Sequence, residues 1–354
     1  MTDDALVASW FDAALDAVAS APIAASRRLA VAGSLVQLSA SSDAVADVVL
    51  AGLVPPVDAT ADDAGLPVAR WRAVDGTRVT LPPPPFGAED LLPRDGIQGG
   101  STERFRLAWA IERQVLWALD LQRGEGLIWL RDPAGAAPWD RAAPWRPLLA
   151  WWLPTTGATL VHAAAVAPPG RPDRGALLVG AGGAGKSTLA LACGCAGWTV
   201  TADDYLVVAP DVRRGGWIAT APYRWAKADP STQALLDLPT AWFVPGIDHL
   251  GKSLVDLPTA FGPLGAAPIR IVAAVAPRRA PDTGSAQSAH PAAFLAATGP
   301  STVLQTPGDA SAVLRILGDV ARSTPSWSLA VGPDVAVAGP AALDRLLTDL
   351  VVAP

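Results

Sequence analysis

The sequence is poor in cysteine, the residue that most often marks a secreted or disulfide-stabilised protein. It contains two, Cys193 and Cys195, which are separated by a single glycine. Cysteines this close cannot join distant parts of a fold, and a zinc site would need further ligands nearby. We therefore expect two small packing residues on a helix, and the scarcity of cysteine predicts a reduced, cytoplasmic protein.

Long apolar runs and basic runs are lacking too. The most apolar segment, residues 148–167, is interrupted by Pro154, Gly157 and His162 within one helix length, so no membrane span is predicted. The net charge is −6 and the pI is near 5.1, which argues against a nucleic-acid partner. The first residues are acidic and amphipathic, unlike a signal peptide, and the apolar stretch after an early twin-arginine pair is too short for an export signal.

The chain is long enough for two domains, and its character changes near residue 145. The first part mixes helix and strand patterns with turn signals. It predicts helices over 4–19, 42–53 and 101–121, a strand or hairpin over 28–40, a hairpin over 67–81 around Asp75-Gly76, an irregular loop over 82–100 and a strand over 126–132. We therefore predict an α/β protein whose residues 1–145 form an accessory or substrate-recognition domain.

Residues 146–354 are expected to form the catalytic domain. Its pattern predicts strands over 158–167, 175–180, 198–202, 205–209 and 269–277, and helices over 186–197, 309–322 and 341–351. Residues 221–268 are rich in proline, and we predict no regular element there.

The segment from 177 to 190 carries a phosphate-binding loop. Gly180, Gly185, Lys186 and Ser187 match the G-x-x-x-x-G-K-[ST] pattern, and an apolar strand precedes the loop while a helix follows it. Backbone N–H groups at a helix start bind anions, Lys186 would bridge the β- and γ-phosphates, and Ser187 would help hold Mg²⁺. We expect the nucleotide to contact Gly180, Ala181, Gly182, Gly183, Ala184, Gly185, Lys186, Ser187 and Thr188.

Two adjacent acids, Asp203 and Asp204, follow the loop after one helix and one strand. This short spacing places them at the carboxyl end of the strand expected to neighbour the loop strand, beside the phosphates. One carboxylate could order Mg²⁺ while the other accepts a proton from a substrate hydroxyl. We assign Mg²⁺ to Ser187 and Asp204, and the sequence leaves open which aspartate is the general base.

Several other residues are candidates for the same site. A lone histidine in an apolar strand is usually a packing residue, but the strand of His162 is expected to run beside the loop strand and to bring His162 to the same end of the sheet. A cation could stabilise the charge of the transferring phosphoryl group. The candidates downstream are Arg224, Lys227, His249 and Lys252, with Arg278-Arg279 as a weaker pair. Of these, Lys252 after Gly251 is preferred as a catalytic residue.

Taken in order, "VHAAAVA", "GALLVGAGGAGKSTLAL" and "AGWTVTADDY" resemble the HPr kinase/phosphorylase family over roughly residues 146–210. The resemblance implies a catalytic domain related to phosphoenolpyruvate carboxykinase, with ATP and Mg²⁺ as cofactors. It implies that His162, Lys186, Asp203 and Asp204 form the active site, and that the acceptor is a serine of a protein. A homo-oligomer would suit the family, although no sequence feature marks an interface.

The sequence also departs from this family. No counterpart of its glycine-rich "EIRGLG"-type segment follows the two aspartates, so neither phosphorolysis nor HPr as the substrate is expected. The chain looks more like the HPr-kinase-related proteins of bacterial peptide-modification gene clusters, which implies a peptide or protein acceptor. Two other functions stay open: a small-molecule kinase, and a protein that binds ATP as a sensor or scaffold without transferring phosphate.

Overall fold

The structure, a computed structural model, divides the chain into two compact units, Met1–Thr156 and Gly157–Pro354. The division falls later in the chain than the boundary predicted between residues 145 and 146. The structure describes residues 4–54, 68–92, 96–97, 100–136, 138–247, 251–263, 268–305 and 309–352. Both units contain helices and mixed sheets, which confirms the predicted α/β class. In this part of the chain, no helix is both long and apolar enough to cross a membrane.

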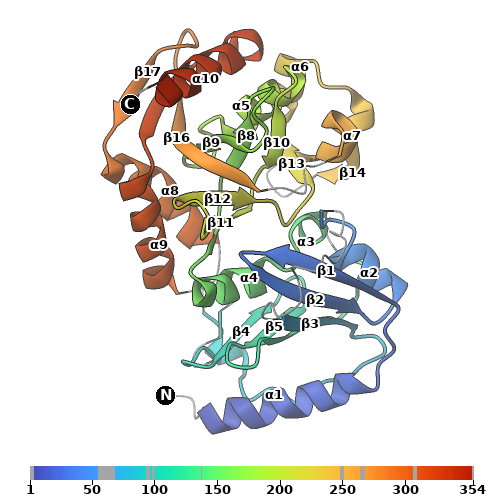
Figure 1. Ribbon diagram of the computed structural model, residues 1–354. Coiled ribbons are helices and arrows are strands. Elements are labelled where there is room, and N and C mark those ends of the chain that lie inside the picture. Colours follow the sequence, from blue (N-terminus) through green and yellow to red (C-terminus); the bar gives the residue numbers. More distant parts are fainter. Residues whose placement is uncertain are drawn as a thin grey trace. The chain divides into compact units, whose positions relative to one another are not determined.

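Unit 1 is built on a six-stranded mixed sheet (Figure 1). The strand order is β1-β2-β3-β6-β5-β4, with β3 parallel to β2 and to β6 and the other pairs antiparallel. The strands are β1 (Ala25–Val31), β2 (Ser34–Ala40), β3 (Val68–Asp75), β4 (Phe105–Ala110), β5 (Val115–Asp120) and β6 (Glu125–Leu130). The helices are α1 (Asp4–Ala19), α2 (Asp43–Val49), α3 (Pro138–Ala142) and α4 (Arg146–Trp152), with short 3₁₀ turns at Ala88–Asp90 and Leu153–Thr156.

The core of unit 1 lies on both faces of this sheet. On one face, α1 buries Trp10 and Phe11 against Phe105 of β4 and other strand residues. On the other, Trp71 of β3 lies 6.1 Å from Trp145 and 5.8 Å from Trp152, measured between ring centroids. Aromatic side chains bury large apolar areas, so these contacts fix helices to both faces.

Several local predictions for unit 1 are confirmed. Helix α1 spans the predicted residues, β1 and β2 form a hairpin where a strand or hairpin was predicted, and β6 overlaps the predicted strand but begins one residue earlier. The helix predicted over 42–53 is present as α2, and the Ser42 hydroxyl caps it by accepting a hydrogen bond from the N–H of Val45.

Two other predictions are wrong. Residues 101–121 form the hairpin of β4 and β5 rather than a helix. All six residues of β5 are buried, so apolar side chains occur at both odd and even positions, and the alternation that marks a half-buried strand is absent. The segment around Asp75-Gly76 is not a hairpin, because β3 pairs in parallel with β2 and β6 and its end is held by local hydrogen bonds to Asp75.

Unit 2 contains a nine-stranded sheet with the order β10-β8-β9-β16-β12-β11-β7, to which β18 and β17 are added beyond β16. Only the pairs β9–β16 and β16–β18 are parallel. The strands are β7 (Thr159–Val161), β8 (Ala164–Ala167), β9 (Arg174–Leu178), β10 (Thr199–Ala202), β11 (Leu206–Pro210), β12 (Trp217–Thr220), β16 (Ile269–Arg279), β17 (Ala286–Ala289) and β18 (Ser326–Val331). A second, three-stranded sheet has the order β13-β15-β14.

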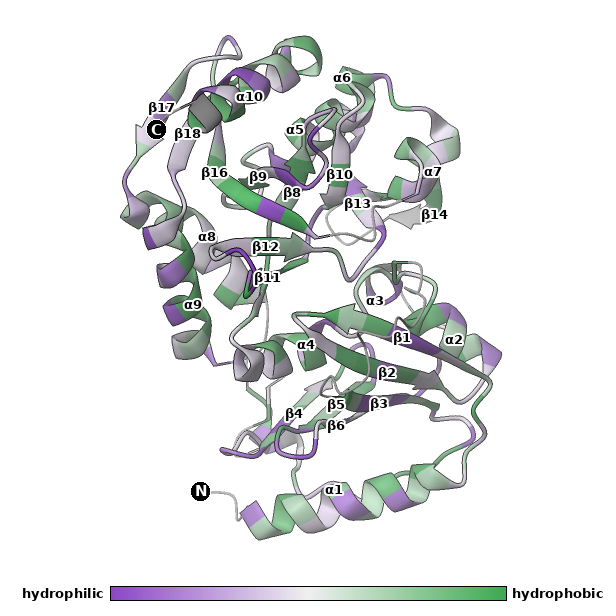
Figure 2. Cartoon of the chain, in the orientation of Figure 1, coloured by the Kyte–Doolittle hydropathy of each residue, from purple (hydrophilic) through white to green (hydrophobic). Residues whose placement is uncertain are grey.

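Several helices of unit 2 bury apolar residues in its core. Helix α5 packs against α10, β8 and β10, and α9 buries Ile316 and Leu317 while its hydrophilic residues face outward (Figure 2). The helices are α5 (Lys186–Cys195), α6 (Pro230–Leu236), α7 (Leu257–Phe261), α8 (Pro291–Gln305), α9 (Ala310–Ser323) and α10 (Val335–Val352). Both cysteines lie on α5, as expected. Cys193 is buried in the core, whereas Cys195, the last residue of the helix, is exposed and is not a core packing residue.

The proline-rich stretch, for which no element was predicted, contains β13 (Trp225–Ala228), α6, the 3₁₀ turn Thr240–Trp242, β14 (Phe243–Ile247), β15 (Ser253–Asp256) and α7. A proline lies in the first turn of both helices, Pro230 in α6 and Pro258 in α7, where a missing N–H costs nothing. Of these elements, β13 and α6 contribute residues to the pocket described below.

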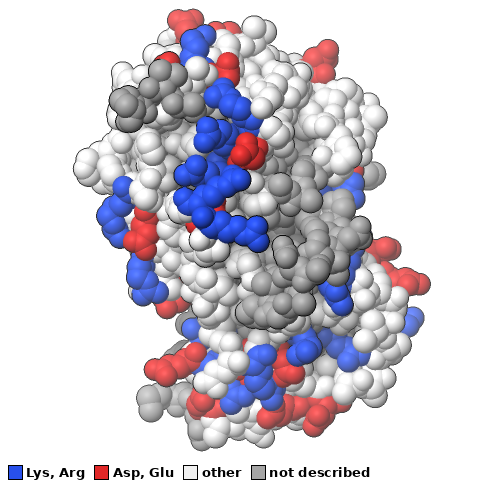
Figure 3. Space-filling view, in the orientation of Figure 1, with Lys and Arg blue, Asp and Glu red and all other residues white. Residues whose placement is uncertain are grey.

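Arginines gather at the edge of the large sheet where β9 and β16 begin. Arg174 and Arg270 are side by side in the parallel pair, and Arg214 lies 3.6 Å from a carboxylate oxygen of Asp173. Figure 3 shows basic side chains in a band over one face of unit 2. The fold therefore brings together basic residues that form no run in the sequence.

We predict that Asp120→Asn destabilises unit 1 by about 3 kcal/mol. The Asp120 side chain is fully buried and accepts hydrogen bonds from Arg104 Nη2 at 2.6 Å and from the N–H groups of Gln122 and Arg123. Burial raises the pKa of Asp120, but the hydrogen bonds from Arg104 and these N–H groups outweigh it and hold the pKa low. The stabilisation that the Asp120 carboxylate provides should therefore be present above about pH 4, and it should be lost as the pH falls through the lowered pKa.

The measurement is urea unfolding of the full chain at pH 7, followed by tryptophan fluorescence. The matched control is Asp132→Asn. The Asp132 carboxylate also accepts hydrogen bonds from two backbone N–H groups, those of Ala134 and Gly135, but its side chain is exposed. If the two substitutions lower the free energy of unfolding equally, the burial of Asp120 and its contact with Arg104 contribute nothing to stability.

Candidate active site

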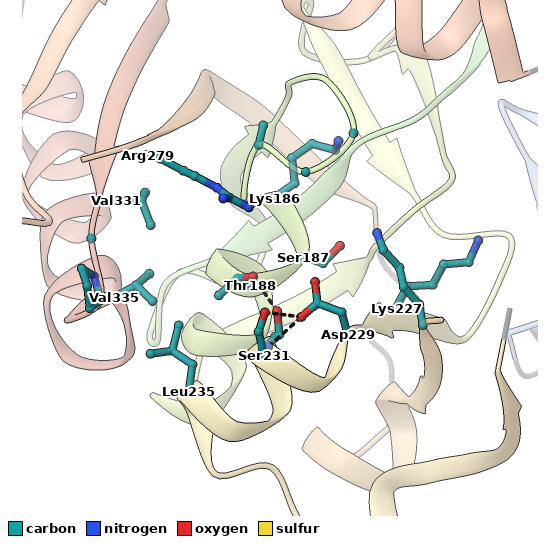
Figure 4. A pocket seen from close by; sticks show the side chains of 18 of the residues that line it. Lys186, Ser187, Thr188, Lys227, Asp229, Ser231, Leu235, Arg279, Val331 and Val335 are labelled. Atoms are coloured by element: carbon teal, nitrogen blue, oxygen red, sulfur yellow. Dashed lines mark hydrogen bonds between the residues drawn. The ribbon is translucent and has the colours of Figure 1, made fainter. Parts of the chain in front are cut away.

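A pocket of about 520 Å³ lies in unit 2 over the phosphate-binding loop (Figure 4). Its lining combines the loop with residues from distant segments. They are His162, Gly182, Gly183, Ala184, Gly185, Lys186, Ser187, Thr188, Asp204, Lys227, Asp229, Ser231, Thr232, Leu235, Lys252, Arg279, Ala280, Val331, Gly332, Pro333 and Val335. The volume is within the range of small-molecule sites.

The loop has the form of an anion cradle. A Cβ atom placed on Gly182, Gly183 or Gly185 would meet nothing within 4 Å, so open space lies beside the loop backbone at these positions. Gly183 and Gly185 have φ values of +78° and +98°, which L-residues with a side chain rarely adopt. Helix α5 begins immediately after Gly185, and its free N–H groups favour an anion there. The residues therefore fit a phosphate chain.

Lys186 is buried beneath the loop. Its Nζ donates hydrogen bonds to the carbonyl oxygens of Gly180 at 2.8 Å and Ala181 at 3.2 Å. Burial lowers the pKa of Lys186, and Lys252 adds to this, while Asp203 and Asp204 act in the opposite direction. The cation is thus fixed at the position where phosphate oxygens would be cradled.

His162 lies at a break between two strands, and Asp203 and Asp204 lie at a second break that is opposite the first in the sheet. The chain leaves β7 and enters β8 at His162, and it leaves β10 and enters β11 at Asp203 and Asp204. Since β7 pairs with β11 and β8 pairs with β10, both interruptions occur at the same place in the sheet. The His162 Nε2 is consequently 3.4 Å from an Asp204 carboxylate oxygen.

This arrangement refines two sequence predictions. The predicted strand over 158–167 is divided into β7 and β8, and β8 does lie beside the loop strand β9. However, β10 does not neighbour β9, because β8 lies between them. The aspartates still reach the loop, since β10 and β9 are both antiparallel to β8 and end at the same edge.

The two aspartates have different surroundings. The Asp203 carboxylate accepts a hydrogen bond from Ser187 Oγ at 3.0 Å and another from the N–H of Lys227 at 3.1 Å. Asp204 has a φ of +72°, and its carboxylate lies 2.9 Å from Lys227 Nζ. Thus Asp203 is the carboxylate that lies against Ser187, whereas Asp204, together with Ser187, was assigned to Mg²⁺ from the sequence.

Their ionisation differs accordingly. Burial and the neighbouring Asp204 charge raise the pKa of Asp203, and its hydrogen bonds from Lys227 and Ser187 only partly oppose this. Burial also disfavours the charged form of Asp204, but the Lys227 cation and the His162 contact outweigh it and hold the pKa of Asp204 far below its usual range. Asp204 is therefore ionised at neutral pH.

No group of three or more His, Cys, Asp and Glu side chains that could hold a metal ion occurs among the described residues. Mg²⁺ at phosphoryl-transfer sites usually takes one or two carboxylates, with substrate phosphates and water as the remaining ligands. Ser187 and Asp203, whose oxygens are adjacent beside the loop, fit that requirement.

The structure brings together most of the predicted site residues. His162, Asp204, Lys252 and the loop from Gly182 to Thr188 line the pocket, and Asp203 is buried directly behind Ser187. Among the other candidate cations, Lys227 and Arg279 also line it, whereas Arg224 forms a bidentate ion pair with Asp256. His249 lies outside the described residues.

Asp229, Ser231 and Thr232 also line the pocket, and sequence reasoning missed them. Asp229 caps α6 by accepting a hydrogen bond from the N–H of Thr232, and Thr232 Oγ1 lies 2.9 Å from Thr188 Oγ1 of the loop. The Asp229-Pro230 pair is a helix-start signal that could have revealed α6.

The chain was compared with known proteins. No family model matches it, and no curated protein matches it. Among the solved structures, it is distantly similar to the HPr(Ser) kinase/phosphatase from Coxiella burnetii, with 12% sequence identity and a TM-score of 0.28. The similarity covers 54% of this chain and 99% of that protein's chain.

We predict that Lys227→Met destabilises unit 2 by about 3 kcal/mol at pH 7, because it leaves the Asp204 carboxylate without its main cation. Without Lys227, burial should raise the pKa of Asp204. The loss should therefore become smaller as the pH is lowered from 7 to 5, where the carboxyl group can take up a proton.

Urea unfolding at the two pH values checks this. Lys252→Met is the control, since it removes a cation from the same pocket while the Lys227–Asp204 ion pair stays. A loss that is the same at both pH values, or equally large in the control, would contradict the role given to Lys227.

Proposed function

We propose that this protein is an ATP-dependent, Mg²⁺-requiring kinase of the HPr-kinase-like type, which transfers the γ-phosphate to a serine hydroxyl of a peptide or protein. One observation carries the proposal: two adjacent carboxylates beside a phosphate-binding loop have different partners. Asp203 lies against Ser187, and Asp204 lies between His162 and Lys227. A second, ionised carboxylate in the pocket favours a catalytic protein over one that only binds nucleotide.

In this proposal, Asp203 and Ser187 hold Mg²⁺, which when bound neutralises charge on the phosphates. The loop N–H groups and Lys186 position the phosphate chain. Phosphoryl transfer depends mainly on such positioning and on electrostatic stabilisation. The assignment of the metal to Asp203 follows from its hydrogen bond to Ser187.

Asp204 would act as the general base. Its low pKa keeps it ionised, and its contact with His162 Nε2 orients the carboxylate. The acceptor hydroxyl gives its proton to Asp204 as its oxygen bonds to the γ-phosphorus, the bond from that phosphorus to the β–γ bridging oxygen breaks, and ADP leaves with that oxygen. Lys227 and Lys252 both line the pocket and could stabilise negative charge there.

The central test combines the protein with ATP, Mg²⁺ and candidate acceptors, namely the products of neighbouring genes and a panel of small hydroxyl and amine metabolites. Mass spectrometry should detect the gain of one phosphoryl group on a serine of a peptide or protein. Phosphorylation of a metabolite alone would favour a small-molecule kinase. Tight ATP binding without any product would favour a sensor or scaffold protein.

We predict that Lys186→Ala lowers the rate of transfer by at least about 10²-fold, because it removes the cation fixed beneath the loop. The rate is measured with saturating acceptor. Arg224→Ala is a control, because it removes a cation of unit 2 that is paired with Asp256. Normal transfer by Lys186→Ala would exclude the loop as the phosphate site.

We also predict that the two aspartates can be separated by their magnesium dependence. Asp203→Asn should raise the Mg²⁺ concentration needed for half-maximal transfer by about 10-fold, since a ligand of the ion is weakened. Asp204→Asn should lower the maximal rate by roughly 10²-fold or more with little change in that concentration, since it removes the base.

The double substitution Asp203→Asn/Asp204→Asn should leave ATP binding measurable and abolish turnover. Transfer at the normal rate by the double variant would show that the catalytic assignment is wrong, and a reversed pattern in the single variants would exchange the two roles.

A further inference from the structure

The pocket has two parts of different chemistry on opposite sides of the loop. We call the side with His162, Asp204, Lys227 and Lys252 the catalytic arm. The other side, which we call the apolar arm, contains Leu235, Ala280, Val331, Pro333 and Val335 together with Arg279. In Figure 4, Val331, Val335, Leu235 and Arg279 lie on one side of the loop and of the start of α5, and Lys227 lies on the other.

The backbone of the apolar arm is held in place by contacts within the protein. It is formed where β18 ends and α10 begins, and its backbone is held by hydrogen bonds from Ala280 N–H to the Val331 carbonyl at 3.0 Å and from Gly332 N–H to Thr283 Oγ1 at 2.7 Å. A Cβ atom on Gly332 would lie 2.6 Å from the Pro281 carbonyl oxygen, so only glycine allows this close approach. The wall is therefore fixed before any ligand arrives.

Apolar side chains are not needed to bind phosphates. Leu235 is 41% exposed although it lines the pocket, and an exposed leucine at a binding site gains free energy when a ligand covers it. Arg279 is also exposed, and its side chain extends from the end of β16 into the pocket toward the loop (Figure 4). A guanidinium group above an apolar wall is suited to contact with a flat aromatic ring.

We propose that the apolar arm is the nucleoside subsite, in which Arg279 and the wall of Leu235, Val331 and Val335 hold the base of the nucleotide. The inference rests on the proposed ATP site. If the loop holds the phosphate chain with its γ end toward Asp204, the nucleoside must extend to the opposite side of the loop. The apolar arm is the part of the lining found there.

The test compares the binding of ATP with that of inorganic tripolyphosphate, both with Mg²⁺, to the full chain by isothermal titration calorimetry without an acceptor. ATP should bind more tightly than tripolyphosphate. Arg279→Ala and Leu235→Ser should each raise the Kd for ATP by about 10-fold, as expected for the loss of a cation–π or an apolar contact. The Kd for tripolyphosphate should change by less than about 2-fold.

Arg278→Ala is the matched control, because Arg278 precedes Arg279 on β16, is exposed and does not line the pocket. It should leave both Kd values unchanged. If Arg279→Ala weakens both ligands equally, Arg279 contacts the phosphates and the nucleoside assignment is overturned. It is also overturned if the wild-type chain binds both ligands with equal affinity.

The failure of the proposed function would look different. A folded wild-type chain that binds neither ligand would exclude the ATP site itself, and with it the subsite. If both ligands bind and Lys186→Ala weakens both, the phosphate site stands, and the comparison of Arg279→Ala with Arg278→Ala alone decides the nucleoside subsite.

Discussion

The burial of two adjacent carboxylates, Asp203 and Asp204, constrains the rest of unit 2. An uncompensated carboxylate in a protein interior costs several kcal/mol, and a second one beside it adds repulsion. The compensating groups come from three separate segments: Ser187 at the start of α5, His162 between β7 and β8, and Lys227 on β13 through both its side chain and its N–H. The loop, the strand interruption and the small sheet must therefore assemble together for either carboxylate to be tolerated.

The sequence predicts those parts of the site whose geometry is local. The strand, loop and start of α5 follow one another directly, so the glycine spacing and Lys186 suffice to define the cradle. Strands β8 and β9 do pair, and the position of His162 at the loop end of the sheet was predicted from this expected pairing of its strand with the loop strand. Which acid meets Ser187 was not, because it depends on backbone direction: neighbouring residues at a strand end point to different sides, and Asp204 adopts a left-handed conformation.

The failed predictions for β5 and for the proline-rich stretch share a physical cause, which is that tertiary contacts decide the burial of these residues. Strand β5 is buried on both faces because the helices of unit 1 cover both faces of its sheet, and a local pattern cannot report this. Likewise, β13 is short, and Lys227 becomes important only through Asp203 and Asp204, which precede it by more than twenty residues in the chain. The contribution of the proline-rich stretch to the pocket could thus not be predicted from periodicity.

The charge of the pocket is opposite to that of the whole chain, and this supports a polyanionic ligand. The chain has a net charge of −6, yet the described lining of the pocket contains four cations, Lys186, Lys227, Lys252 and Arg279, and two acids, Asp204 and Asp229. An excess of cations in a concave site attracts anions, and the negative net charge of the whole chain disfavours their non-specific binding elsewhere. A neutral metabolite alone would leave this excess positive charge without a counter-charge. A nucleoside triphosphate would neutralise it and, through its base, would also cover the apolar wall on the far side of the loop.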